Sequence, residues 1–220
     1  MRSSRIWIPG ALLLLFVTNL HAQMGMRGGP PPVRGFYNPV VGHGSTYEFS
    51  SSDGKKVLME IAVVGKESVN GKDGFWFENT VSNSPEGEMI MKHFDVLDGS
   101  DVSVVRMIMQ LPGKPPMEMP SQMLQMARQK QPADVRTNAD DVGSETVTTP
   151  AGGFKTEHWR MKDGSGDVWI SSEVSPFGLV KYQGKDQSMV LTKTTTDAKD
   201  KITGTPQPFN PMMFGGPPQP

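Results

Sequence analysis

Residues 88–111, with the sequence EMIMKHFDVLDGSDVSVVRMIMQL, show most clearly which fold the chain predicts. They contain two runs of strand-favouring side chains, Glu88 to Val96 and Val102 to Leu111, on either side of Asp98-Gly99. Aromatic and β-branched residues favour strands, and a Gly-containing turn reverses the chain between them. We therefore expect two consecutive antiparallel strands in this stretch.

The same alternation of short strand and turn continues through residues 45–202. The other predicted strands cover 45–50, 57–64, 75–81, 146–149, 154–161, 167–171, 179–183 and 189–195. Their connectors are rich in Gly, Pro, Asp, Asn and Ser, as in the hairpin signal Asp53-Gly54. About ten regularly spaced strands predict a mainly antiparallel β protein, and the absence of strand–helix–strand alternation excludes a Rossmann or P-loop architecture.

One segment in the middle of the chain has the pattern of a helix. Pro120 stands where the first turn of a helix tolerates proline, and Pro132 ends the pattern. We predict a helix near 120–131 and a polar loop over 134–143. The expected fold class is therefore an antiparallel open (half) β-barrel or curved sheet, with one inserted α-helix lying across its open side.

Residues 1–22 have the pattern of a secretory signal peptide. Arg2 and Arg5 precede an apolar run, Ile6 to Val17, and Ala22 is a small residue at the expected cleavage site. The apolar run is too short for a membrane anchor, and no later segment is long enough for a transmembrane span. We therefore expect a protein of the periplasm or a secreted protein, cleaved near Ala22.

Gly and Pro are concentrated at both ends of the remaining chain. Residues 23–44 and 203–220 are rich in both, so they predict a flexible linker and a flexible tail. Between them, 45–202 has ordinary Gly and Pro content and predicts one β-rich domain. The tails are further candidates for contact with an envelope protein partner.

The composition excludes several functional classes. The chain has no cysteine, which excludes disulfides, thiolate metal sites, a cysteine nucleophile and a lipidated N-terminal cysteine. Its 22 basic and 23 acidic residues give a net charge of −1, which argues against nucleic-acid binding. No serine-hydrolase elbow, zinc-protease motif or phosphate-binding loop is present. We expect a protein that is not an enzyme and needs no cofactor.

Methionine is the compositional anomaly, with 16 residues in the chain. The candidate ligand-binding residues are Met89, Met91, Met107, Met109, Met119, Met123 and Met126. Flexible thioether side chains are typical of adaptable apolar surfaces, so these residues either line the core or line a cavity for an apolar ligand. A third hypothesis is copper, because Met89, Met91 and His93 alternate along one strand face and their donor atoms suit Cu(I). Copper stays an alternative hypothesis, and we assign no residue as a metal ligand.

The plan of signal peptide, long antiparallel sheet and mid-chain helix resembles the periplasmic lipoprotein carriers of the LolA and LolB type. That resemblance implies an unclosed β-barrel around helices, with an apolar cavity for acyl chains. Residues 167–181 (DVWISSEVSPFGLVK) and 149–155 (TPAGGFK) also resemble segments of uncharacterised exported bacterial proteins. Because the resemblance is one of pattern, it transfers no functional residue to this sequence.

These observations favour an exported, non-catalytic binding protein for an apolar ligand, a lipid or an acylated protein, in the bacterial periplasm. Two alternatives remain open. One is a copper-binding protein that uses methionine and histidine ligands, and the other is a structural envelope protein that acts through its tails.

Overall fold

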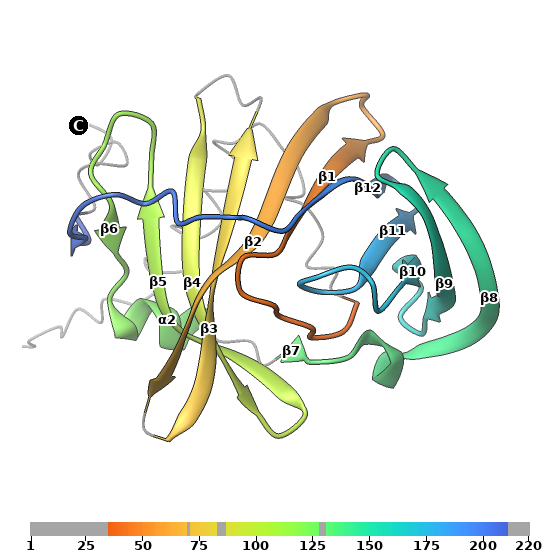
Figure 1. Ribbon diagram of the computed structural model, residues 1–220, viewed down its shortest axis with the longest axis horizontal. Coiled ribbons are helices and arrows are strands. Elements are labelled where there is room, and N and C mark those ends of the chain that lie inside the picture. Colours follow the sequence, from red (N-terminus) through yellow and green to blue (C-terminus); the bar gives the residue numbers. More distant parts are fainter. Residues whose placement is uncertain (1–34, 70, 83–86, 128–130, 211–220) are drawn as a thin grey trace, which may run out of the picture. The chain divides into compact units, whose positions relative to one another are not determined.

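Most strands of the sheet pair with their neighbours in sequence. The computed structural model describes residues 35–69, 71–82, 87–127 and 131–210 (Figure 1). The strands are β1 (Gly44–Ser51), β2 (Lys56–Val69), β3 (Lys72–Ser82), β4 (Met89–Asp98), β5 (Asp101–Gln110), β6 (Met117–Glu118), β7 (Gln131–Pro132), β8 (Ala139–Thr149), β9 (Gly152–Met161), β10 (Gly166–Ile170), β11 (Leu179–Gly184), β12 (Gln187–Thr195) and β13 (Gln207–Pro208). The helical elements of the described residues are α2 (Ser121–Ala127) and a single 3-10 turn, η1 (Val135–Asn138).

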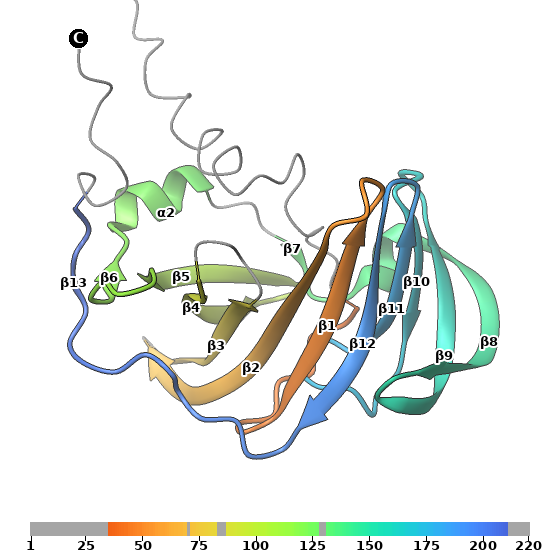
Figure 2. The same cartoon turned by 90° about the horizontal axis from the view of Figure 1, so that it is seen from above.

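The sheet is one open, mainly antiparallel layer. Its strand order is β13-β6-β5-β4-β3-β2-β1-β12-β11-β10-β9-β8, with β7 paired to β5 off this path. The pairing of β1 with β12 joins the hairpins of the first half to those of the second, and β13 runs parallel to β6. The two ends of the sheet, β13 and β8, lie apart (Figures 1 and 2), so the sheet does not close.

The predicted fold class is confirmed, and each of the ten predicted strands is present. The hairpin over 88–111 is formed by β4 and β5, which pair from Ile90 with Gln110 to Asp98 with Asp101. A slip of one residue would exchange the side chains of the two faces, so the different surroundings of these faces specify the pairing.

Two predicted boundaries are wrong. The helix predicted near 120–131 is described over Ser121–Ala127, and residues 128–130 lie outside the described ones. Gln131 and Pro132 instead pair with β5, so pairing with the sheet overrides the helical pattern there. The loop predicted over 134–143 contains η1, and β8 begins within it at Ala139. Most of β8 is exposed at the edge of the sheet, and an edge strand needs few apolar residues.

One part of the core lies on the face of the sheet that two loop segments cover. Tyr47, Val63 and Phe77 are almost completely buried there. Residues 171–178 cover this face: Phe177 stacks on Phe77 at 5.2 Å between ring centroids, and the Tyr47 hydroxyl donates to the Leu179 carbonyl at 2.9 Å. Stacked aromatic pairs and satisfied hydroxyls fix how loop and sheet fit together.

Residues 35–43 form the second covering segment. They belong to the predicted linker over 23–44, of which 23–34 lie outside the described residues. The Phe36 N–H donates to the Phe177 carbonyl and the Asn38 N–H to the Pro176 carbonyl, both at 2.8 Å. Gly178 has a φ of +68° and the Phe36 ring lies directly against it, so a side chain there would be strained and would clash. The aromatic side chains of this segment therefore anchor it beside the core.

Within the described part of the chain, none of the helices has the length and apolar character needed to cross a membrane. The predicted signal peptide, residues 1–22, lies outside the described residues.

Candidate functional site: a methionine-lined face of the sheet

Five methionine side chains share one face of β4, β5 and β6. Register places Met91 opposite Met109, and Met109 opposite Met117, so these three form a row across the strands. Met89 and Met107 belong to the same face because side chains two residues apart along a strand point the same way. We call Met89, Met91, Met107, Met109 and Met117 the methionine face.

Exposure varies across the methionine face. Met117 and Met109 are buried, at 0% and 7% relative exposure, whereas Met89, Met91 and Met107 are half-buried. Met117 is not among the candidate ligand-binding residues named from the sequence, although its alternation with Met119 around Glu118 is a short strand pattern. The face therefore has two buried thioethers with three half-buried ones beside them, which is an adaptable apolar surface.

Helix α2 lies over the same face. The helix contacts β5, and its Leu124 side chain is buried at 5% exposure. Figure 2 shows α2 on one side of β3, β4 and β5 and the C-terminal segment, described below, on the other. Seven residues are too few for a helix to be stable by itself, so α2 depends on this packing.

The three methionines predicted around the helix lie in different surroundings. Met119 precedes α2 and its N–H donates to the Met107 carbonyl at 2.8 Å, which ties the start of the helix to β5. Met123 is 38% exposed on α2. Met126 belongs to α2, but its side chain lies outside the described ones. The predicted ligand set is thus brought together for Met89, Met91, Met107 and Met109, with Met119 at its border.

A shallow cleft lies between the start of α2 and residues 206–209. It has a volume of about 400 Å³ and is lined by Glu118, Met119, Pro120, Pro206, Pro208 and Phe209. Of the methionines predicted to bind a ligand, Met119 lines it. Residues 207 and 208, which lie in the predicted tail over 203–220, form β13 beside β6 here, while 211–220 lie outside the described residues.

His93 lies on the same strand face as these methionines and has one aromatic partner, Phe77, and one polar partner, Asp95. It stands opposite Met107 on β5 and opposite Phe77 on β3, and its ring stacks on Phe77 at 5.4 Å with an interplanar angle of 12°. Its Nδ1 lies 2.6 Å from Oδ1 of Asp95, and the two side chains are 6% and 0% exposed. A buried carboxylate is tolerated only with such hydrogen bonding, and this contact fixes the orientation of the imidazole.

The opposite face of the sheet is covered by the C-terminal segment, residues 198–209. The segment crosses this half of the sheet from β1 to β6 (Figure 1), and Ile202 packs against the cluster of Trp76, Phe94, Val96 and Ile108. Lys201 Nζ donates to Glu60 at 2.6 Å and to the Thr80 hydroxyl at 3.1 Å, and Lys92 pairs with Asp200. Ion pairs and apolar packing together hold the segment on the sheet.

Glu78 is the buried acid beneath this segment, at 1% exposure. Burial raises its pKa to about 7; the Lys201 N–H, which donates to both carboxyl oxygens at 3.2 and 3.0 Å, opposes this, whereas Asp200 raises the pKa further. Burial also acts to raise the pKa of Asp200, but hydrogen bonds from Lys92 and Glu78 outweigh it and lower that pKa. Glu78 is therefore the weaker acid of the two, and its protonated carboxyl can donate to Asp200 between the sheet and the C-terminal segment.

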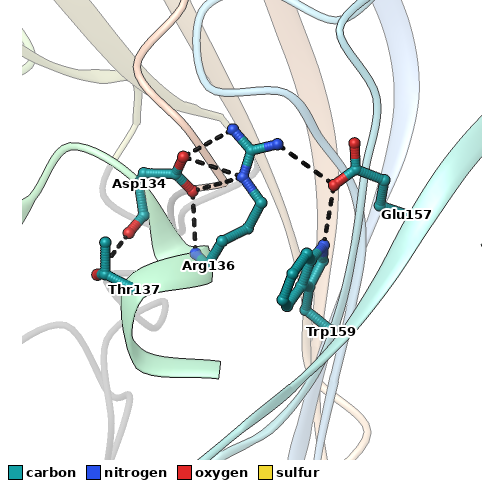
Figure 3. A network of polar contacts seen from close by, with 5 residues as sticks. All are labelled: Asp134, Arg136, Thr137, Glu157 and Trp159. Carbon is teal, nitrogen blue, oxygen red and sulfur yellow. Dashed lines mark hydrogen bonds and ion pairs between the residues drawn. The ribbon is translucent and has the colours of Figure 1, made fainter. Parts of the chain in front are cut away.

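A second polar cluster surrounds Arg136 on η1 (Figure 3). Its guanidinium forms a fork on Asp134, with three contacts between 2.7 and 2.9 Å, and reaches Glu157 of β9 at 3.3 Å. Glu157 also accepts from Trp159 Nε1 at 3.1 Å. Burial opposes ionisation of Asp134, but the Arg136 hydrogen bonds outweigh it and lower the pKa of Asp134. Because each charge here has a partner, the cluster fastens η1 to β9 and suits a structural role.

His158 has its own ring partner. It stacks on Trp169 at 4.3 Å, and its Nε2 lies 3.0 Å from Asp167. The neighbouring Glu157 faces Trp159 and Arg136 on the other side of β9, as the strand alternation predicts. Within the described residues, no group of three or more His, Cys, Asp or Glu side chains is placed to hold a metal ion.

No family model and no curated protein matches the sequence. Among solved structures, the chain is similar to a protein described as exported, with a YmcC-like fold, from Bacteroides fragilis: 14% identity, TM-score 0.38, covering 74% of this chain and 100% of that one. A protein described as a lipoprotein from Parabacteroides distasonis gives the same identity and TM-score, with coverage of 74% and 99%. MucB, in complex with MucA(peri), gives 9% identity and a TM-score of 0.34, covering 74% of this chain and 53% of MucB. These values do not assign the chain to a family, and its architecture is described by its own strand order.

Proposed function

We propose that this protein is an exported, non-catalytic binding protein that holds an apolar ligand, an acyl chain of a lipid or lipoprotein, between the methionine face and α2. The observation that carries the proposal is the set of five methionines that register brings onto one face of three neighbouring strands. Their side chains can change shape with a ligand because an unbranched thioether has several low-energy rotamers.

The small size of α2 supports binding at this face. The helix has seven residues, and Leu124 is its buried anchor among the described side chains. Displacing one leucine costs about 2–3 kcal/mol, whereas each methylene of an acyl chain buried in its place gains about 0.8 kcal/mol. A chain of several methylenes could therefore replace the contact between Leu124 and the sheet.

Two parts of the proposal, export and a non-catalytic role, are supported by the sequence alone. Residues 1–22 have the pattern of a secretory signal peptide. The sequence has no motif of a serine hydrolase, zinc protease or phosphate-binding enzyme. An acyl chain is bound by apolar contacts alone, and the methionine face supplies such contacts.

The test is a titration of the full chain with palmitate that carries an environment-sensitive fluorophore. Met107→Gln should weaken binding about tenfold because it places a polar amide on the face, whereas Met107→Leu should retain affinity within about threefold. Val142→Gln on the exposed edge strand β8 is the control and should change nothing. Equal effects of the Gln and Leu variants, or no saturable binding by the unchanged protein, would contradict the proposal.

A further inference from the structure

His93 has the features of an oriented metal ligand. Its Nδ1 is engaged by the fully buried Asp95 at 2.6 Å, and its ring is held flat against Phe77. When a carboxylate accepts the Nδ1 proton of a neutral imidazole, the lone pair is left on Nε2. A carboxylate that orients a histidine in this way is the usual companion of a histidine that binds metal.

Soft donor atoms lie on both sides of His93 on the same face. Met107 stands directly opposite it on β5, and Met91 precedes it by two residues on β4. Opposed Cβ atoms in an antiparallel pair are about 5 Å apart, and those two residues apart on one strand about 7 Å. Both spacings allow an imidazole and two thioethers to converge on one ion. Met109, opposite Met91, is a buried third thioether beside this group.

We propose that His93 Nε2 and the thioether sulfurs of Met91 and Met107 form a binding site for a soft monovalent cation, Cu(I). Thioether and imidazole donors select Cu(I), whereas divalent hard ions require oxygen donors. The negative charge of Asp95 stabilises a cation bound at the far nitrogen of the ring. The Cu(I) site shares Met91 and Met107 with the methionine face, but it does not depend on acyl binding there.

The ligand set differs from the one that the sequence suggested. Met89, Met91 and His93 share a strand face, but Met89 lies four residues from His93, about 13 Å along the strand. Met89 pairs with Val81, at the far end of β4. Register instead brings Met107 from the neighbouring strand directly beside His93, so Met107 takes the place of Met89 in the site.

The direct test uses the full chain with methionine methyl groups labelled with ¹³C. Ag(I) is the probe because it has the ligand preference of Cu(I) without redox chemistry. One equivalent should shift the methyl signals of Met91 and Met107, together with the His93 ring signals, and further equivalents should not shift these groups again. Shifts confined to other methionines, or none, would overturn the proposal.

Variants supply the second test, a Cu(I) competition against a chromogenic chelator under reducing conditions. His93→Gln should lower Cu(I) affinity at least about 100-fold, and Met91→Leu and Met107→Leu each about tenfold, because each variant keeps the bulk but removes a donor atom. Asp95→Asn should lower Cu(I) affinity about tenfold, because Asp95 is a positioning residue that orients the His93 ring. The matched controls are Met59→Leu and Met189→Leu, which are buried in β2 and β12 and should bind as the unchanged protein does.

The variants also separate the site from a structural role of the same residues. Met107→Leu should lose Cu(I) affinity while it retains the acyl probe, so one protein gives opposite results in the two titrations. If His93→Gln does not fold, the ¹³C experiment on the unchanged protein still decides. Equal Cu(I) affinity in the Met107→Leu variant and the Met59→Leu control would overturn the site.

Discussion

Raising the pH from about 5 to about 8 should weaken the attachment of the C-terminal segment to the sheet. The segment is held in part by Glu78, which is buried and has a pKa raised to about 7. While Glu78 is protonated it can donate to Asp200 and still accept the Lys201 N–H. Once Glu78 is ionised, its buried carboxylate lies near the negative charge of Asp200. The repulsion between the two charges destabilises the contact between the C-terminal segment and the sheet.

The magnitude follows from the two pKa values of Glu78. The folded protein keeps the proton up to a pKa of about 7, whereas the reference value is 4.5. Folding therefore takes up a proton between these values, so the stabilising contribution is fully present below 4.5 and is lost as the pH rises through 7. Linkage then predicts a fall of about 2–3 kcal/mol in the free energy of unfolding between about pH 5 and about pH 8.

Asp200 does not alter this window. Its pKa is lowered from 3.8, so its contribution is present above that value and is lost only in more acidic solution. The loss of stability between about pH 5 and about pH 8 therefore belongs to Glu78.

The assay is urea unfolding of the unchanged protein and of Glu78→Gln at several pH values in this window. Glutamine resembles the protonated acid, so the variant should keep most of the stability at about pH 5 and lose most of the pH dependence. At about pH 8 it should be more stable than the unchanged protein by about 2 kcal/mol. Glu48→Gln, at a half-buried position of β1, is the control that should keep the original slope. A flat profile for the unchanged protein, or an equal slope in Glu78→Gln, would refute the reasoning.

Three further predictions concern packing. Gly178→Ala should lower the free energy of unfolding by about 1–3 kcal/mol, measured in urea, because of the positive φ and the Phe36 ring; an unchanged midpoint would contradict this. Tyr47→Phe should cost about 1–2 kcal/mol in the same assay, since the buried Leu179 carbonyl loses its donor; a neutral effect would remove that hydrogen bond from the explanation. Leu124→Ala should speed amide exchange in α2 while β4 and β5 stay protected; uniform loosening of the sheet would show that the helix is not a separable element.

The strands were predictable because their side chains alternate or are continuously apolar between Gly-containing turns. β8 was recognised only over 146–149, since Val142 is the one large apolar residue in 139–145 and an exposed edge strand leaves no hydrophobic period. The predicted helix over 120–131 reaches too far because the pairing of Gln131 with Val102 depends on the position of β5 and not on local propensity.

The candidate site was predictable only in part. The alternation of Met89, Met91 and His93 is visible in the sequence, but the pairing of His93 with Met107 depends on the register of the β4–β5 hairpin and its bulge after Phe94. The contact of Glu78 with Lys201 joins residues 123 positions apart, a separation that no periodicity reports. The signal peptide and the role of the terminal segments stay predictions.

Native mass spectrometry of the mature chain, purified from a periplasm without detergent, tests most directly whether this protein carries an apolar ligand. The methionine face predicts a heterogeneous adduct of lipid-like mass that Met107→Gln depletes and Met107→Leu retains. A bare chain that gains no mass when lipids are offered would contradict the acyl-binding proposal.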